Sequence, residues 1–387
     1  MFHLLLALVY LSFISLGLPD GLLGAAWPAM YGDLGVPVAY AGILSMIICV
    51  GTILSSLMCQ RLTCKLGPGK VTAISVALTA AALFGFSLSR EYWMLCLWAI
   101  PYGLGAGSVD ATLNNYVALH YSSRHMSWLH CMWGVGASTG PYIMGFVLTG
   151  GIHWSLGYTI VGLIQISLSA ILFFSLPLWR GKSMEDGQSA TIPLPLTKAV
   201  KVPGAKEVMI TFLCYCALEQ TAALWSGSYL TLHAGLSTDI AASFSSLFFL
   251  GITAGRAISG FVTMKLNDTQ MIRLGLCIIA AGVVILLLPF GIPGAMIGLM
   301  LVGLGCAPIY PCIMHSTPAH FGADKSQALM GIQTASAYVG TAMMPPLFGL
   351  IANHIGISLL GIYLAVLLVI MVSTHEMLVK KCKKHPS

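Results

Sequence analysis

The chain has 387 residues, of which 57% are hydrophobic and 8% are charged, and its formal net charge is +6. A soluble domain carries about 25% charged residues, so this composition excludes a water-facing surface and indicates a polytopic helical membrane protein. The eleven cysteines are scattered without zinc-ligand or disulfide spacing, and the basic residues do not cluster on a soluble face. We therefore expect no metal, no cofactor and no nucleic-acid partner.

Twelve segments reach the roughly 20 mainly apolar residues that a membrane-spanning helix needs. The first has no basic start and is too long for a signal peptide, so it is interpreted as a transmembrane helix. A polar connection over 180–205 divides the chain into an N-terminal six-helix bundle (1–179) and a C-terminal bundle with a basic tail (206–387). The predicted spans are 3–31, 39–62, 70–89, 92–120, 125–150, 154–179, 206–233, 240–265, 269–289, 292–319, 326–353 and 356–378.

Lysine and arginine gather on one side of these spans. Sixteen of the 18 lie on the side of the two termini, Arg90 lies on the other side, and Arg256 lies inside a span. The positive-inside rule then predicts a multi-pass plasma-membrane protein (a cell inner membrane) whose termini and 180–205 loop are cytoplasmic. We expect a monomer.

The two halves repeat at an offset of 200 residues. With a slip of one residue, Asp20 also falls on Glu219. Internal duplication of six-helix halves is typical of secondary transporters, whose substrate sites lie near the membrane midplane between the halves. The offset superposes Ala41 on Ala241, Ser45 on Ser245, Gly51 on Gly251, Lys65 on Lys265, 103–105 on 303–305 and His120 on His320.

Four charged side chains lie inside predicted spans: Asp20, Asp110, Glu219 and Arg256. A charge at the bilayer centre costs roughly 2.5–3.5 kcal/mol on insertion scales. We therefore expect these groups to face one another, a polar cavity or a protonation equilibrium. Ionisable groups at this depth mark candidate functional sites.

In the first span, residues 17–24 read GLPDGLLG. The proline and glycines weaken the helix around Asp20, and backbone groups freed at membrane depth must be satisfied by protein or by cavity water. This segment is predicted to border a wet site. The alternative is a simple kink in which Asp20 caps a freed amide.

In the fourth span, residues 103–115 read GLGAGSVDATLNN. Asp110 and Asn114 are four residues apart and share a helix face, so together they could bind hydroxyl groups. No strand precedes the glycines, which excludes a dinucleotide loop and favours close helix packing. The alternative for Asp110 is a structural hydrogen bond to a neighbouring helix.

The fifth span adds His130 and Trp133, one turn apart. Each is a candidate solute ligand, and each has a structural alternative, a satisfied histidine or a packed aromatic. In the second half, the candidate solute ligands are Glu219 and Gln220, the counterparts of Asp20, with Trp225 further along the same helix and Tyr310 in the tenth span. Arg256 could pair with Glu219 as a gating or structural ion pair, or could snorkel to a membrane edge.

At these residues the chain resembles the major facilitator superfamily, and more narrowly its fucose–galactose–glucose:proton symporter family. The resemblance rests on the Asp20 segment, on the Asp110–Asn114 segment and on Tyr310-Pro311. It implies two pseudo-symmetric six-helix bundles and a sugar carrier. Carried over from the family, Asp20 and Asp110 would bind sugar and couple protons, Asn114 would match the family's helix 4 asparagine, and its helix 5 amides would fall near His130 and Trp133.

The chain departs from that family's pattern at several positions. Asp110 stands where the family usually has glutamate, Pro19 stands where it has asparagine, and the helix 5 amides become histidine and tryptophan. The loop signature after the second span keeps its arginine, glycine and lysine but lacks the usual aspartate. These departures predict an altered pocket.

We therefore hypothesise an alternating-access carrier, and no enzyme, that imports a small hydroxylated solute such as a monosaccharide with protons. Sodium is the alternative coupling ion. The alternative functions are a proton-antiport exporter of drugs or metabolites and a non-transporting receptor or scaffold. An intramembrane enzyme fits worst, because no nucleophile–base pair is evident in the sequence.

Overall fold

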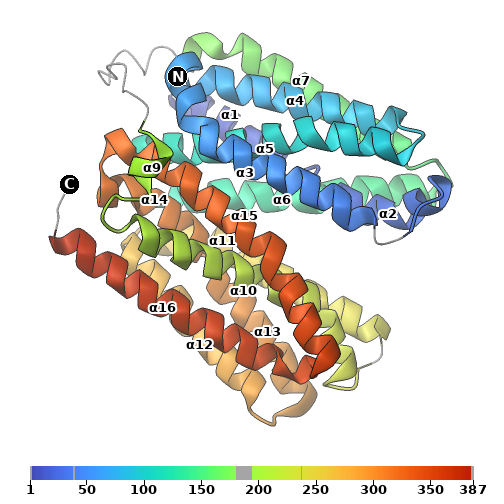
Figure 1. The fold of residues 1–387 in the computed structure, drawn as a ribbon, viewed down its shortest axis with the longest axis vertical. Helices are drawn as coiled ribbons and strands as arrows, with labels where there is room; N and C mark the ends of the chain where they lie inside the picture. Colours follow the sequence, from blue (N-terminus) through green and yellow to red (C-terminus); the bar gives the residue numbers. More distant parts are fainter. Residues whose placement is uncertain (1, 38–39, 180–193, 237, 385–387) are drawn as a thin grey trace. The chain divides into compact units, whose positions relative to one another are not determined.

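The computed structural model describes residues 2–37, 40–179, 194–236 and 238–384, and every regular element in those ranges is a helix (Figure 1). The chain divides into two compact units, each described by itself below. Unit 1 contains Met1–Tyr116 and Leu129–Pro195, and unit 2 contains Val117–Trp128 and Leu196–Ser387. Most of the predicted 180–205 loop lies outside the described residues, which resume at 194.

Each of the twelve predicted spans coincides with one helix or with two consecutive helices. The first half forms α1 (Phe2–Gly17), α2 (Leu22–Asp33), α3 (Tyr40–Leu66), α4 (Pro68–Leu88), α5 (Tyr92–His120), α6 (Ser123–Thr149) and α7 (Ser155–Phe174). The second half forms α9 (Leu196–Ala199), α10 (Ala205–Leu232), α11 (Thr238–Val262), α12 (Asp268–Leu287), α13 (Gly291–Cys306), α14 (Ile309–Phe321), α15 (Ala323–His354), η1 (Ile357–Leu359) and α16 (Leu360–Lys384).

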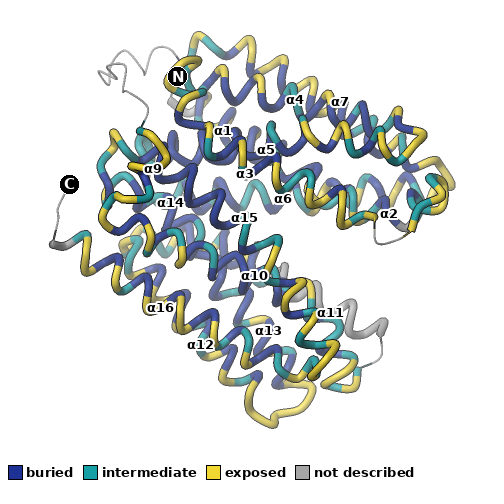
Figure 2. The backbone as a smooth tube through the Cα atoms, viewed as in Figure 1, coloured by how far each residue is buried: buried dark blue, intermediate teal, exposed yellow. Residues whose placement is uncertain are grey.

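Helix length and apolarity agree with a membrane protein. Among the described residues, nine segments are long and apolar enough to cross a bilayer. Many large apolar side chains are exposed, including Phe174 at 86% and Phe146 at 74%, and exposed positions alternate with buried ones along the helices (Figure 2). Such a surface suits lipid rather than water.

Two of the spans are interrupted. The first span stops being helical over residues 18–21 between α1 and α2, as its proline and glycines predict. The tenth span is interrupted at Ala307-Pro308, between α13 and α14. The break therefore falls at Pro308 and not at Pro311, and Tyr310 lies in the first turn of α14.

Glycines bring helices together in the same way in both units. In unit 1, a Cβ built on Gly103 would lie 2.2 Å from the carbonyl oxygen of Ile48, so α5 touches the backbone of α3. In unit 2, a Cβ on Gly303 would lie 2.6 Å from the carbonyl oxygen of Phe248, so α13 touches the backbone of α11. The offset of 200 residues thus preserves a helix–helix contact made through small residues.

The tightest glycine contact joins α6 to the interruption of the first span. A Cβ on Gly140 would lie 1.8 Å from the carbonyl oxygen of Leu18, whereas a Cβ on Gly145 of the same helix would meet nothing within 4 Å. Backbone cannot rotate away as a side chain can, so a methyl group at Gly140 must push the two segments apart.

We predict that Gly140→Ala lowers the free energy of unfolding by about 1–3 kcal/mol, the usual range for overpacking. Gly145→Ala is the matched control and should change it by less than about 0.5 kcal/mol. Thermal unfolding of the purified variants in detergent measures both. Equal melting temperatures for the two variants would contradict this packing.

Candidate functional site

Asp20 lies at the interruption between α1 and α2, where its backbone nitrogen donates to the carbonyl of Gly17 at 3.0 Å. Its carboxylate is exposed and accepts two hydrogen bonds. Trp133 Nε1 of α6 donates to Oδ2 at 2.8 Å, and the Tyr102 hydroxyl of α5 donates to Oδ1 at 3.4 Å. The broken helix therefore presents an open carboxylate that two aromatic side chains orient.

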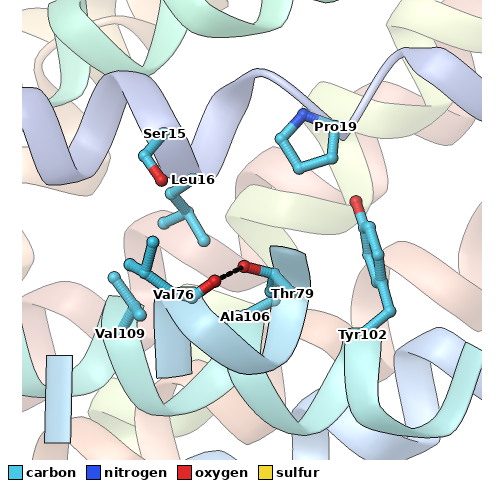
Figure 3. A pocket seen from close by; sticks show the side chains of 8 residues that line it. All are labelled: Ser15, Leu16, Pro19, Val76, Thr79, Tyr102, Ala106 and Val109. Atoms are coloured by element: carbon cyan, nitrogen blue, oxygen red, sulfur yellow. Dashed lines mark hydrogen bonds between the residues drawn. The ribbon is translucent and has the colours of Figure 1, made fainter. Parts of the chain in front are cut away.

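A small cavity lies behind this interruption. Figure 3 shows Pro19 on the non-helical stretch, with the Tyr102 hydroxyl pointing toward it from α5. The cavity volume is about 10 Å³, which is close to the space needed for one water molecule. It is far too small for a solute, and it is lined by Ser15, Leu16, Pro19, Val76, Thr79, Tyr102, Ala106 and Val109.

Asp110, Asn114 and His130 form a buried hydrogen-bonded chain across α5 and α6. Asn114 Nδ2 donates to Asp110 Oδ1 at 2.8 Å, and Asn114 Oδ1 lies 3.0 Å from His130 Nε2. With the amide in this orientation, His130 Nε2 carries a hydrogen and donates to Asn114. All three side chains are buried, so these hydrogen bonds are removed from solvent.

The two predicted acids of the site, Asp20 and Asp110, lie near one another in unit 1. Asp110 is close enough to Asp20 for their charges to repel, although Asp20 is exposed and Asp110 is buried. A proton on either carboxyl relieves this repulsion. Unit 1 thus brings together five of the predicted site residues, Asp20, Asp110, Asn114, His130 and Trp133.

Unit 2 holds a buried ion pair. Arg256 of α11 lies 3.6 Å from Glu219 of α10, measured from Nη2 to Oε1, and both side chains are buried. Tyr215, one turn earlier on α10, donates its hydroxyl to the other Glu219 oxygen. Burial and the ion pair agree with the predicted Glu219–Arg256 pairing and not with an arginine that snorkels to an edge.

The remaining predicted residues of unit 2 make different contacts. Tyr310 packs against Tyr215, with ring centroids 6.1 Å apart. Trp225 donates Nε1 to the carbonyl of Pro345 at 3.0 Å and so joins α10 to α15, and Gln220 is half-buried on α10. Within the described ranges, no three His, Cys, Asp or Glu side chains are placed to hold a metal ion.

Two residues of these clusters were not predicted from the sequence. Tyr215 stands four residues before Glu219, so the spacing that identified Asp110 and Asn114 could have found it. Tyr102 is 82 residues from Asp20, and no local pattern connects them. Only the packing of α5 against the interrupted span does so.

Buried charges on membrane-length helices, arranged in two similar units, define a polytopic membrane transporter. A family model described as Major Facilitator Superfamily matches residues 9–314 and 209–379. The chain belongs to the major facilitator superfamily, as its sequence resemblance implies, and it is a secondary transporter rather than an enzyme.

Relatives with similar sequences are distant. An uncharacterized MFS-type transporter of Yersinia pestis is 25% identical over an alignment of 347 residues, and the alignment covers 87% of each chain. The glucose/mannose transporter GlcP of Bacillus subtilis (strain 168) is 23% identical over an alignment of 331 residues, which covers 78% of this chain and 77% of that protein.

Solved structures share the fold. FucP in the outward conformation aligns with a TM-score of 0.80 at 14% identity, covering 96% of this chain and 98% of FucP. The proton:xylose symporter XylE aligns with a TM-score of 0.79 at 12% identity, covering 97% of this chain and 94% of XylE. At these identities the likeness establishes the all-helical major facilitator fold alone.

In unit 1, Asn114 joins Asp110 to His130 through buried hydrogen bonds. We predict that Asn114→Ala lowers the free energy of unfolding by about 1–3 kcal/mol, because it removes the buried hydrogen bonds that Asn114 makes with Asp110 and His130. Ser138→Ala, at an exposed position of α6, is the control and should change it little. Thermal unfolding of the two variants in detergent measures the difference. An effect of Asn114→Ala as small as that of Ser138→Ala would show that the hydrogen bonds of Asn114 do not stabilise the fold.

The ion pair of unit 2 makes a non-additive prediction. Removing one partner, as in Glu219→Gln, should cost about 3–5 kcal/mol because it strands a buried charge. The double variant Glu219→Gln, Arg256→Met should cost clearly less than the sum of the two single variants. Additive losses in a thermal double-mutant cycle would show that the pair does not interact.

Proposed function

We propose that this transporter imports a small hydroxylated solute, a monosaccharide, together with protons, and that Asp20 and Asp110 carry the coupling. The observation behind this proposal is the pair of neighbouring acids, Asp20 at the interrupted first span and the buried Asp110 on α5. Such a pair favours a state in which one carboxyl holds a proton. Neutralising a carboxylate by protonation also lowers the free energy needed to move the site through apolar surroundings.

The groups around Asp20 suit a sugar. A carboxylate accepts hydrogen bonds from hydroxyl groups, and the half-buried indole of Trp133 offers an apolar face beside it. A hydroxyl that replaces the Trp133 or Tyr102 hydrogen bond to Asp20 would reorient the carboxylate. Solute binding would then alter the affinity of Asp20 for its proton, which is the linkage that symport requires.

The names of two similar proteins support the same class of solute. GlcP is named a glucose/mannose transporter, and XylE is named a proton:xylose symporter. The fucose:proton symporter FucP of E. coli shares the fold. The positive-inside distribution further supports a plasma-membrane protein with cytoplasmic termini, and we propose that it acts as a monomer.

In the second unit, we propose that Glu219 and Arg256 form a structural or gating pair, with Gln220, Trp225 and Tyr310 as candidate solute contacts. Burial supports a structural or gating role, because the charges of Glu219 and Arg256 neutralise one another and need no solute to do so. A cationic drug carried by an exporter would instead be drawn to Asp20, so substrate class separates the two functions.

Uptake into proteoliposomes with an imposed proton gradient tests the proposal. The panel contains fucose, galactose, glucose, mannose and xylose, and a lipophilic cation represents the exporter. We expect uptake of at least one sugar, and a loss of about tenfold or more in Asp20→Asn and Asp110→Asn, since one charge-assisted hydrogen bond is worth about 1.5–3 kcal/mol.

Asp33→Asn is the matched control, because Asp33 is the last residue of α2 and its carboxylate accepts from Trp154 at 2.8 Å. Its uptake should stay near that of the unmodified protein. Sugar-dependent alkalinisation of the medium at an unchanged rate in Asp110→Asn would refute the proton role. Transport of the cation, with no sugar transported, would replace import by export.

A further inference from the structure

A second polar cluster lies within unit 2, where the connection between α5 and α6, part of the segment Val117–Trp128, contacts α12 and α14. His315 of α14 places Nδ1 at 2.6 Å from Asp268 Oδ2, at the start of α12, and Nε2 at 3.1 Å from the carbonyl oxygen of Tyr121. Ser123, the first residue of α6, donates to the other Asp268 oxygen at 2.5 Å. None of these residues belongs to the candidate site.

Both ring nitrogens of His315 face hydrogen-bond acceptors, so each nitrogen must carry a hydrogen to satisfy both. A backbone carbonyl can only accept a hydrogen bond, and an ionised carboxylate can only accept. A neutral imidazole has one N–H and one lone pair, so it can satisfy either Asp268 or Tyr121 while its lone pair repels the other. The cluster is complete only when His315 carries both protons.

We propose that protonated His315 is a clasp that holds the α5–α6 connection against α12 and α14, and that loss of one proton opens it. The connection joins the two helices that carry Asp110, Asn114, His130 and Trp133. The clasp would add to the transport cycle a pH-sensitive step that is separate from proton binding at Asp20. Histidine suits this role because its ordinary pKa is about 6.5.

The start of the clasp is rigid at α12. Asn267 caps the helix by accepting from the Gln270 backbone nitrogen at 2.9 Å, and the Gln270 side chain accepts from the Asn267 nitrogen at 3.0 Å. This capping box fixes the backbone beside Asp268.

An apolar contact holds the same connection without a titratable hydrogen bond. Trp128 packs edge-on against Phe261 with ring centroids 5.5 Å apart, and a Cβ on Gly260 would lie 2.1 Å from Trp128 Nε1. The connection thus has a pH-insensitive contact on α11 and a pH-sensitive one on α12 and α14. Opening the clasp would loosen the connection without detaching it.

Other titratable groups surround the clasp, but their contacts differ from those of His315. Arg124 lies over the Trp128 ring at 5.7 Å, and His125 lies edge-on to Tyr121. The neighbouring titratable groups are Cys312 and His320 on α14 and, beyond His320, His375 and Glu376 on α16 and Arg273 on α12.

Cys312 is a native reporter for the clasp. Its side chain is fully buried, and its Sγ lies 3.9 Å from the Ser123 hydroxyl. Opening the clasp should therefore expose Cys312 to a thiol reagent. Cys64 on α3 is exposed and serves as an internal reference that corrects for the intrinsic pH dependence of thiol alkylation.

The test is brief alkylation of the full-length protein in nanodiscs with N-ethylmaleimide at about pH 6 and about pH 8.5, on either side of an ordinary histidine pKa. Peptide mass spectrometry gives the ratio of Cys312 to Cys64 modification. We expect this ratio to rise at least about threefold with pH in the unmodified protein. No variant is needed for this result, and an unchanged ratio would overturn the proposal.

Two histidine variants locate the effect. His315→Gln should give a high ratio at both pH values, because glutamine cannot donate to two acceptors on opposite sides. His320→Gln, on the same helix, should keep the pH dependence, and a pH dependence lost there and kept in His315→Gln would overturn the proposal. Since alkylation needs neither solute nor a proton gradient, its outcome is independent of the uptake assay.

Discussion

Every ionisable group inside these helices has to be neutralised or held by partners, and this constraint organises the molecule. A bare charge in hydrocarbon is costly, and the chain meets that cost differently in its two units. Unit 2 pairs Glu219 with Arg256. In unit 1, the charges of Asp20 and Asp110 repel one another, and a proton on either carboxyl lowers this repulsion. These two acids are therefore suited to respond to a proton, and the Glu219–Arg256 pair is suited to hold α10 against α11.

Close backbone contact makes these arrangements possible. Gly136 and Gly140 bring α6 against the first span, because Cβ atoms there would lie 2.1 and 1.8 Å from carbonyl oxygens of Ile14 and Leu18. That approach carries Trp133 to Asp20. The interruption at Pro19 in turn frees the carboxylate from the helix surface. Small residues and one proline, none of which touches a solute in this account, thus determine where the acid points.

Much of this organisation follows from local sequence patterns. The interruption around Asp20 follows from its proline and glycines, the Asp110–Asn114 pair from helical spacing, and the duplicated helix contact from the repeat of Gly103 at Gly303. Long-range partners do not follow. Tyr102 reaches Asp20 across 82 residues, and His315 reaches Asp268 across 47, because tertiary packing and not spacing brings them together.

In the proposed mechanism, Asp20 and Asp110 bind or release a proton when the solute binds. Infrared difference spectroscopy of the protein in lipid, recorded on adding a transported sugar, reports the carbonyl band of protonated carboxyl groups directly. The account predicts a change in this band that is lost in Asp20→Asn or in Asp110→Asn and kept in Asp33→Asn. A band that does not respond to the solute, or that responds equally in all three variants, would contradict it.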